Sequence, residues 1–504
     1  MRRPAIPFPA ICTVARRSFG RDRRVGAERQ RGLTIGHAFG RAHLPMGGGL
    51  RRLRPCVATW RGERATYESR SDGRRRPRDL PCGVSRVPRW KFSGLALFLL
   101  GCLLPGRAAD EAWFDRVQDA LTFSTPAGDV RARLSGSIDL EGYRVQLPAP
   151  GVLATADGSL LETRLTTFLD AQFGPRTYFF AQARADHGFD PSENRAEFRL
   201  DEVALRFAPG PRRQFNLQFG RFATLVGNWT TRHGSWANPF ITAPLPYEHL
   251  TGMWDTDAIR NSNVLLQWSH VRPGLSPRVT AIEKSLRLPI VWGPSYADGV
   301  MLADKLGKFR YAVEAKLGSL SSRPEAWRHS REQRHHPTFS ARGEYRPNAT
   351  WQVGVSASDG AYLREFAARS VANGYGRGDY RQQVVAADLT YAYRHWQIWS
   401  EVFATRFTIP NVGDADTVAW YAEARYRITP RFSGALRWNQ QVFATIPDRT
   451  GPTRWGHDVW RLDAAPVWRL TAHTQLKLQY SLQHGDSAPR TTTRTLAAQA
   501  TVRF

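Results

Sequence analysis

Apolar and polar residues alternate at successive positions along most of the chain after residue 130. In the last stretch, 493–504, Leu496, Ala500, Val502 and Phe504 fall on one side of an extended strand, and mostly polar residues fall on the other. Because successive side chains of a strand point to opposite faces, this alternation predicts strands with one apolar face. The same division recurs in 130–145, 309–317, 418–428 and 476–483.

The length of these segments separates two kinds of β protein. A soluble β-sandwich alternates too, but its strands usually have about five or six residues. Many segments here reach about ten residues or more, which is the length that a tilted strand needs to cross a membrane. Aromatic residues also gather toward segment ends, as at Tyr391, Trp396 and Phe432, where membrane interfaces would lie. The pattern predicts an all-β fold, a transmembrane antiparallel β-barrel.

Short and long connections alternate between the predicted strands. Short links fall at Gly174-Pro175, Arg394-His395 and Thr429-Pro430. Outer-membrane barrels have short periplasmic turns, long external loops and an even number of strands. We count eighteen strands, with sixteen as the alternative because the pair near 280 and 300 is the least regular, and either barrel should leave an aqueous lumen. The strand centres are near 138, 167, 181, 202, 218, 265, 280, 300, 313, 342, 354, 388, 402, 422, 437, 464, 479 and 498.

The net charge of +27 is typical of a nucleic-acid-binding protein, but its distribution is not. Residues 1–108 hold 24 Arg and Lys against 6 Asp and Glu, so most of the excess lies outside the predicted barrel. Residues 1–86 are rich in Arg, Gly and Pro and show no sustained period, which predicts a disordered leader or a misplaced start codon. A nucleic-acid-binding arm is the alternative; we expect no nucleic-acid partner.

Residues 87–108 have the order of a secretory signal peptide. Basic residues precede an apolar run over 92–104, and small residues follow up to Ala108, where we expect cleavage. The run is too short to span a bilayer, and translation would then begin near Val84 or Val87. Lipid attachment at Cys102 is the competing interpretation. The remaining chain would comprise a short periplasmic helical segment, 109–129, and the barrel, 130–504, without any cysteine for disulfides or metal sites.

The third long loop, 223–257, is too apolar to lie in water. Three prolines stiffen it, and we expect it to fold inward and narrow the lumen. A rigid plug or an external cap with no role in selection is the alternative. The candidate constriction residues are Trp229, Arg232, His233, Trp236, Tyr247, Glu248 and His249. If Arg232 lines the constriction, its replacement by Glu should shift selectivity toward cations.

The run LQFGRFATLVGNW at 217–229, with the aromatic and Pro-rich loop after it, resembles a segment of the phosphate-selective porin O and P family. The terminal TVRF is also similar. The resemblance implies an outer-membrane channel that favours anions such as phosphate. Ala223 and Thr224 stand where the family generally has Lys or a polar residue and then Pro, and the family's lumenal arginines have no residue-by-residue match here.

The polar faces of the predicted strands carry more basic than acidic residues. Rings of Arg and Lys favour anions in a passage of low dielectric constant. The alternative is that these charges pair with carboxylates on neighbouring strands and merely solvate the wall. The candidate lumen charges are Arg131, Arg133, Arg310, Lys316, Arg425, Arg427, Arg437 and Lys477.

Signals of catalysis are weak. His329, His335 and His336 match no standard set of metal ligands, and they favour a basic face that meets lipopolysaccharide phosphates. The sequence has no Gly-rich phosphate loop, nucleophile elbow or HExxH motif. A Ser/His barrel hydrolase remains a third hypothesis. We expect no catalytic residue, cofactor or metal.

We therefore expect a porin in the bacterial outer membrane that passes small hydrophilic solutes by passive diffusion. A structural or surface-interaction barrel with a closed lumen is the alternative. Expected partners are outer-membrane lipid, lipopolysaccharide and the barrel assembly machinery, which would recognise Phe504 at the chain's end. A homotrimer is one assembly that such a barrel could form.

Overall fold

The computed structural model describes residues 107–155, 157–186, 197–210, 215–269, 284–324, 335–485 and 492–504. The leader predicted over 1–86 lies outside these residues, as do the start codon near Val84 or Val87 and nearly all of the signal peptide. His329 and the strand centre near 280 lie outside them as well.

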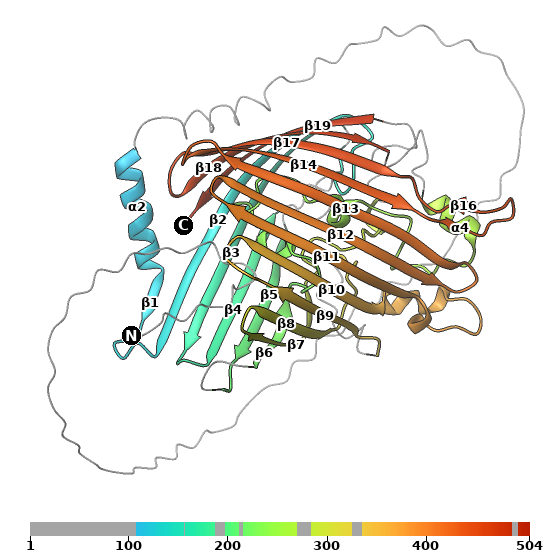
Figure 1. The fold of residues 1–504 in the computed structure, drawn as a ribbon, viewed down its shortest axis with the longest axis horizontal. Helices are drawn as coiled ribbons and strands as arrows, with labels where there is room; N and C mark the ends of the chain where they lie inside the picture. The colour runs from blue at the N-terminus through green and yellow to red at the C-terminus, as the bar shows by residue number, and fades with distance from the viewer. Residues whose placement is uncertain are drawn as a thin grey trace, which may run out of the picture. The chain divides into compact units, whose positions relative to one another are not determined.

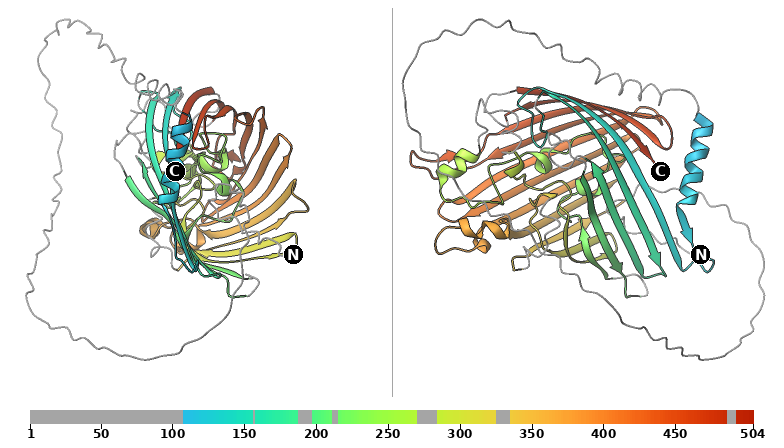
Figure 2. Two further views of the ribbon diagram at one scale, coloured as in Figure 1. Left: turned by 90° about the vertical axis from the view of Figure 1, so that its left-hand side faces the viewer. Right: turned by 180° about the vertical axis from the view of Figure 1, so that it is seen from behind.

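The described strands form one antiparallel sheet that closes on itself (Figures 1 and 2). Each strand pairs with its sequence neighbour, and the last strand pairs with the first along Thr495↔Val145 to Arg503↔Ser137. The ring has sixteen strands: β2 (Val130–Val145), β3 (Ser159–Phe173), β4 (Thr177–Asp186), β5 (Glu197–Phe207), β6 (Asn216–Phe222), β7 (Ala297–Leu306), β8 (Phe309–Lys316), β9 (Thr338–Tyr345), β10 (Trp351–Ala361), β11 (Arg381–Tyr393), β12 (Trp396–Ile409), β13 (Gly413–Arg427), β14 (Phe432–Phe443), β17 (Val459–Arg469), β18 (Thr474–His484) and β19 (Thr492–Arg503).

The prediction of eighteen strands is wrong, and the sixteen-stranded alternative holds. β6 pairs directly with β7, with Gln218 opposite Met301, so the wall has no place for strands near 265 and 280. The segment near 265 is the helix α4 (Ser262–Trp268), whose first turn is capped by the Asn261 side chain. The strand near 300, which the alternative count had doubted, is β7.

The two faces of the wall differ in polarity as the alternation predicts. On the first strand, Ile138 is 50% exposed on the outside while its neighbour Asp139 is fully buried on the inside. The last strand repeats this, with Leu496 54% exposed and Thr495 buried. Apolar side chains therefore cover the outside of the ring, and polar or charged side chains cover most of the inside.

Aromatic side chains pack in pairs on this outer face near strand ends. Trp396 lies 4.7 Å from Tyr426 between ring centroids, and Trp351 lies 4.6 Å from Tyr391. Both pairs are next to short turns, where amphipathic rings would meet a membrane interface.

The connections alternate in length around the ring. The β3–β4, β7–β8 and β11–β12 turns are tight, and each uses a residue with positive φ: Gly174, Gly307 and Arg394. We call this end of the barrel the turn end and the opposite end the loop end. At the loop end, the connection between β12 and β13 departs from this alternation, because both strands extend to a short link at 410–412. The external loops hold η5 (Glu365–Ser370), η6 (Arg377–Asp379) and the small hairpin of β15 (Thr445–Ile446) and β16 (Thr453–Arg454).

A helix precedes the barrel at the turn end. α2 (Arg107–Ala120) leads into β1 (Thr122–Ser124), which pairs with the start of the first barrel strand. The Phe114 ring of this helix stacks on His473, in the turn between β17 and β18, with ring centroids 4.9 Å apart. In the described part of the chain, no helix has the length and apolar character that a membrane span requires.

Candidate functional site: the loop inside the barrel

The connection between β6 and β7 is residues 223–296, which we call the inner loop, and its described residues lie inside the barrel or at its loop end (Figures 1 and 2). It is described at 223–269 and 284–296. It contains η3 (Trp229–Arg232), α3 (Leu245–Glu248) and α4. The loop is longer than the predicted 223–257 because the two strands expected after it are not in the wall. The prediction that it folds inward is consistent with its apolar composition.

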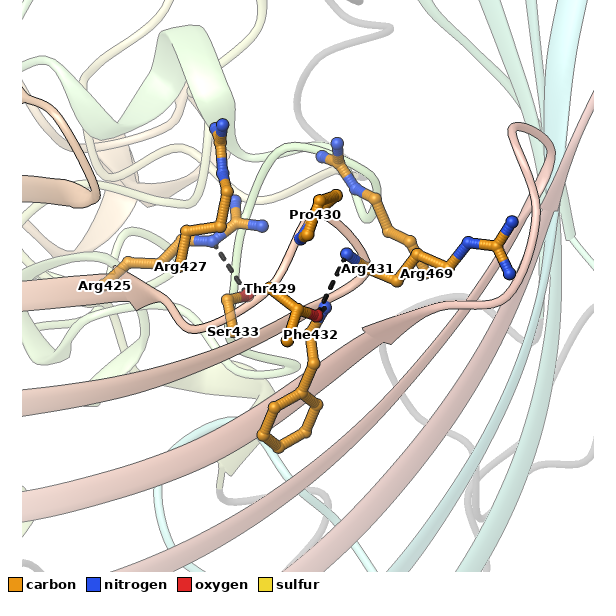
Figure 3. Close-up of a pocket in the computed structure, with 8 residues that line it drawn as sticks. All are labelled: Arg425, Arg427, Thr429, Pro430, Arg431, Phe432, Ser433 and Arg469. Atoms are coloured by element: carbon orange, nitrogen blue, oxygen red, sulfur yellow. Dashed lines mark hydrogen bonds between the residues drawn. The ribbon is translucent and has the colours of Figure 1, made fainter.

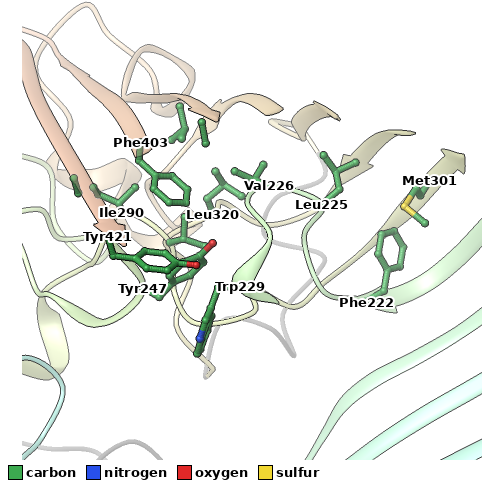
Figure 4. Packing of buried hydrophobic residues seen from close by; sticks show 14 of the residues in the cluster. Phe222, Leu225, Val226, Trp229, Tyr247, Ile290, Met301, Leu320, Phe403 and Tyr421 are labelled. Carbon is green, nitrogen blue, oxygen red and sulfur yellow. The ribbon is translucent and has the colours of Figure 1, made fainter. Parts of the chain in front are cut away.

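An apolar core joins the inner loop to the wall (Figure 4). The Trp229 and Tyr247 rings of the loop lie 4.7 Å apart, and Tyr247 meets Phe403 of β12 edge-on at 5.5 Å. Ile290 and Tyr421 belong to the same buried cluster. The wall strands that face the loop therefore carry apolar side chains on their inner face, which would be unfavourable in an empty water-filled lumen.

A second core lies toward the loop end. Met253, Ile259 and Leu265 of the inner loop pack there with Phe407 of the wall and with Trp455. External loops take part as well, because Tyr362, Tyr380 and Ile446 belong to the same cluster. The inner loop and the loops at this end thus form one packed body.

A buried carboxylate, Glu401 of β12, anchors the start of the loop. One oxygen accepts hydrogen bonds from the backbone N–H groups of Asn228 at 3.0 Å and Trp229 at 2.5 Å, and from the Tyr421 hydroxyl at 2.7 Å. The other accepts the Tyr247 hydroxyl at 2.5 Å. Burial and the carboxylate raise the pKa of Tyr247 well above its ordinary value, so this hydroxyl remains a donor.

Arg232 points at the wall rather than into a passage. Its guanidinium pairs with Glu423 at 2.6 Å, donates to the Tyr421 hydroxyl at 3.1 Å and covers the Trp399 ring at 4.4 Å. The expectation that it lends positive charge to a constriction therefore needs correction, because Glu423 neutralises it. Replacement by Glu would place two carboxylates together in a buried site, and we now expect it to undock the loop.

Glu248 and His249 are buried in the same way. Glu248 forms an ion pair with Arg461 of β17 and accepts the backbone N–H of Ala243 at 2.9 Å. His249 is 3% exposed and lies edge-on to Phe443 at 6.2 Å. Both residues belong to the contact between the loop and the wall, which the sequence could not distinguish from a lumenal position.

His233 and Ser235 face the other side of the lumen. The two ring nitrogens of His233 lie 2.7 Å from the Thr230 carbonyl oxygen and 3.0 Å from the Tyr296 hydroxyl. Burial lowers its pKa to about 4, so the ring is neutral at pH 7. The Ser235 hydroxyl donates to Asp139 at 2.8 Å and accepts from Arg164 at 3.0 Å.

The inner face of β3 and β4 carries charged side chains that water reaches. Arg164 is 20% exposed and Arg184 is 31% exposed, although both point into the barrel. They pair with Asp139 and Asp186. The sequence reasoning did not select either arginine, although the alternation in these two strands places both on the polar face.

Four of the predicted lumen charges have hydrogen-bond or ion-pair partners in the wall or the inner loop. Arg310 pairs with Glu344 at 3.1 Å, and Arg437 pairs with Asp463 at 2.9 Å. The Lys316 ammonium donates to the carbonyl oxygens of Phe222 at 2.7 Å and Ser295 at 3.1 Å, and the Lys477 ammonium donates to that of Ser235. The alternative interpretation, charges that pair with carboxylates on neighbouring strands, describes the two arginines, whereas both lysines donate to backbone oxygens.

The other four lie at the turn end, and two of them have neutral hydrogen-bond partners. Arg133 donates to the Gln118 side-chain oxygen at 3.1 Å, and Arg425 donates to the Ser433 hydroxyl at 3.1 Å. Arg131 and Arg427 are exposed, and no ion pair of these four side chains occurs within the described ranges. Trp236 also reaches this end, where Arg503 lies 4.2 Å above its ring.

Phe504 completes the seam between the first and last strands. Its backbone N–H donates to the Gly136 carbonyl at 3.0 Å, and its carbonyl accepts the Gly136 N–H at 3.1 Å. The ring lies over Gly136, where an added Cβ would be only 2.6 Å from the ring carbon Cζ.

No family model and no curated protein matches the chain. Among solved structures, in-vitro folded OmpT of Vibrio cholerae has a TM-score of 0.47 and 7% identity over 76% of this chain and 99% of that chain. Salmonella typhi OmpF in complex with daunomycin has 0.47 and 12% over 76% and 100%. An anion-selective porin from Comamonas acidovorans has 0.45 and 10% over 74% and 100%. At these scores the barrel assignment stands on the strand pairing itself, and the resemblance to the phosphate-selective family stays a prediction.

Proposed function

We propose that the chain is a channel of the bacterial outer membrane that passes small hydrophilic solutes by diffusion. The observation that carries this proposal is the closed sixteen-stranded ring with apolar side chains outside and charged side chains inside. A closed ring has no edge strand, so the backbone N–H and C=O groups of all its strands are hydrogen-bonded within a bilayer. About sixteen strands also enclose more space than the wall side chains fill. Its short turns would face the periplasm and its long loops the exterior.

The passage would run between the inner loop and the β2–β4 side of the wall. Arg164 and Arg184 are accessible to water there, whereas the β12–β14 side is filled by the apolar cores. His233 and Ser235 would be the loop residues beside the passage. Because the arginines in it are paired with carboxylates, any anion preference would come from the turn end, where unpaired arginines gather.

Electrical recording tests this proposal. Purified refolded protein in a planar bilayer should give stepwise conductance, and a salt gradient should give a reversal potential on the anion-selective side. Replacing Arg427 at the turn end by Glu should lower the anion preference, with Arg406→Glu on the outer surface as the matched control. Absence of channel events from protein shown to be folded would overturn the proposal.

A second candidate, a structural barrel with a closed lumen, is favoured by the extent of the inner loop's packing. The loop forms hydrogen bonds with wall strands far apart around the ring, such as those to Glu314 of β8 and Gln479 of β18. A folded barrel that never conducts would support it. We assign no enzymatic role in either case.

A further inference from the structure

Arginines from two neighbouring turns gather at the turn end of the lumen. Arg425 and Arg427 end β13, Arg431 lies in the turn that follows, and Arg469 ends β17. Together they line a pocket of about 160 Å³ (Figure 3). The hydroxyl-bearing residues Thr429 and Ser433 also line it, so the pocket offers hydrogen-bond donors on several sides.

The positive charge of this pocket is not compensated. The two polar contacts of its guanidinium groups go to neutral oxygens, from Arg425 to Ser433 at 3.1 Å and from Arg469 to Gln475 at 3.4 Å. Within the part of the chain that the structure describes, none of its four arginines forms an ion pair. Glu423, the carboxylate next along the inner face of β13, is already held by Arg232 and Arg437.

Trp236 of the inner loop lies beside the pocket. Arg469 lies 5.4 Å over the ring of Trp236, and Arg503 lies 4.2 Å over the same ring. Such stacking holds a guanidinium in place without neutralising it. An occupant of the pocket would therefore sit where the inner loop meets the turn end, at the turn-end mouth of the lumen.

We infer that this pocket binds a polyvalent oxyanion, such as a compound with two or more linked phosphates, that arrives from the turn end. Several guanidinium groups around one pocket suit this ligand because each can donate two parallel hydrogen bonds to one tetrahedral group. A monovalent anion would use only part of the charge. The inference rests on the proposed channel in one respect: if the protein conducts, the bound anion blocks conduction from one side of the membrane.

The experiment adds inorganic tripolyphosphate to either side of a bilayer that holds the conducting protein. We expect block from one side only, and we expect Arg427→Gln to weaken it about tenfold, as for the loss of one charged hydrogen-bonding partner. Arg427 is exposed, so the variant should fold normally. Arg406→Gln, which removes an equal charge from the outer surface near the loop end, is the control and should leave the block unchanged.

Calorimetry separates the failure of this inference from that of the channel. Folded protein in detergent should bind tripolyphosphate at one saturable site, and the R427Q/R469Q double variant should bind at least about tenfold more weakly. Equal block from both sides, or equal binding by the double variant, would overturn the inference while the channel stands. A protein that binds tripolyphosphate but gives no conductance would overturn the channel and keep the pocket.

Discussion

At the scale of single residues, buried polar groups decide where the inner loop lies. Glu401 satisfies two backbone N–H groups and two tyrosine hydroxyls, and Glu423 holds Arg232. Except for the bond between Tyr421 and Glu401, each of these contacts joins the loop to a wall strand more than a hundred positions away in sequence. Because a buried donor without an acceptor is costly, these carboxylates fix one docked position for the loop.

Replacing Glu401 by Ala should destabilise the docked loop by about 3 kcal/mol, because it leaves buried N–H and hydroxyl donors without an acceptor. Glu401→Gln keeps one carbonyl oxygen and should lose clearly less. The measurements are thermal unfolding, followed by heat-dependent gel mobility, and the noise of single-channel current. Equal melting of wild type and Glu401→Ala would contradict the anchoring role.

The neutral His233 should make stability depend on pH. Its pKa is about 4 in the folded chain and about 6.5 when unfolded, so the unfolded state binds more protons between these values. The stabilisation is complete above pH of about 6.5, falls by roughly 2–3 kcal/mol as pH drops toward about 4, and changes no further below that. Melting curves of wild type and His233→Gln across this range provide the test. Parallel pH dependences would show that another group is responsible.

At the scale of elements, strands and loop obey different rules. A wall strand is specified locally, because each position faces either lipid or lumen. The inner loop is specified by its fit to several strands at once, and its short helices have few stabilising contacts of their own. The seam between β19 and β2 also depends on close packing, since the Phe504 ring lies directly over Gly136, which has no side chain.

Replacing Gly136 by Ala should destabilise the seam by about 1–3 kcal/mol, because the new Cβ would meet both the Phe504 ring and the Thr166 carbonyl oxygen at 2.6 Å. Gly434→Ala is the matched control, since nothing lies within 4 Å of its added Cβ. Thermal unfolding of the two variants gives the comparison. Deleting Phe504 should in addition reduce the yield of barrel in the membrane. Equal stability of the two glycine variants would show that the seam tolerates the group.

At the scale of the whole molecule, the strand count sets the width of the barrel and the length of the inner loop together. With sixteen strands, the described residues between Phe222 and Ala297 belong to a connection that lies inside the ring or at its loop end. The described part of this chain packs against much of the wall, and on the β2–β4 side Arg164 and Arg184 stay partly accessible to water. Conductance is therefore expected to be small for a ring of this size.

Cysteine cross-linking tests the count directly. Leu217 of β6 is opposite Leu302 of β7, so cysteines at these positions should form a disulfide under mild oxidation. Cysteines at Leu217 and Val313 provide the control, since Val313 lies one strand further along. The four native cysteines precede residue 107, and protease mapping identifies the linked peptides. If the first pair forms no disulfide in folded protein, the eighteen-stranded barrel would be favoured again.

The sequence by itself determined what depends on neighbouring residues. Period-two alternation located all sixteen wall strands and predicted their outer faces, as at Ile138 and Asp139, because facing is a local property of a strand. It also placed the candidate lumen charges on the polar face. It mistook 262–268 for a strand, because a short apolar run fits a buried helix equally well.

Only the tertiary structure decided what depends on partners across the lumen. Arg232 and Arg427 have the same chemistry, yet one is neutralised by Glu423 and the other is not. No local pattern carries this difference, because the partner lies on a distant strand whose position depends on how the sheet closes. The strand count, the full extent of the inner loop and the uncompensated charge at the turn end all follow from that closure.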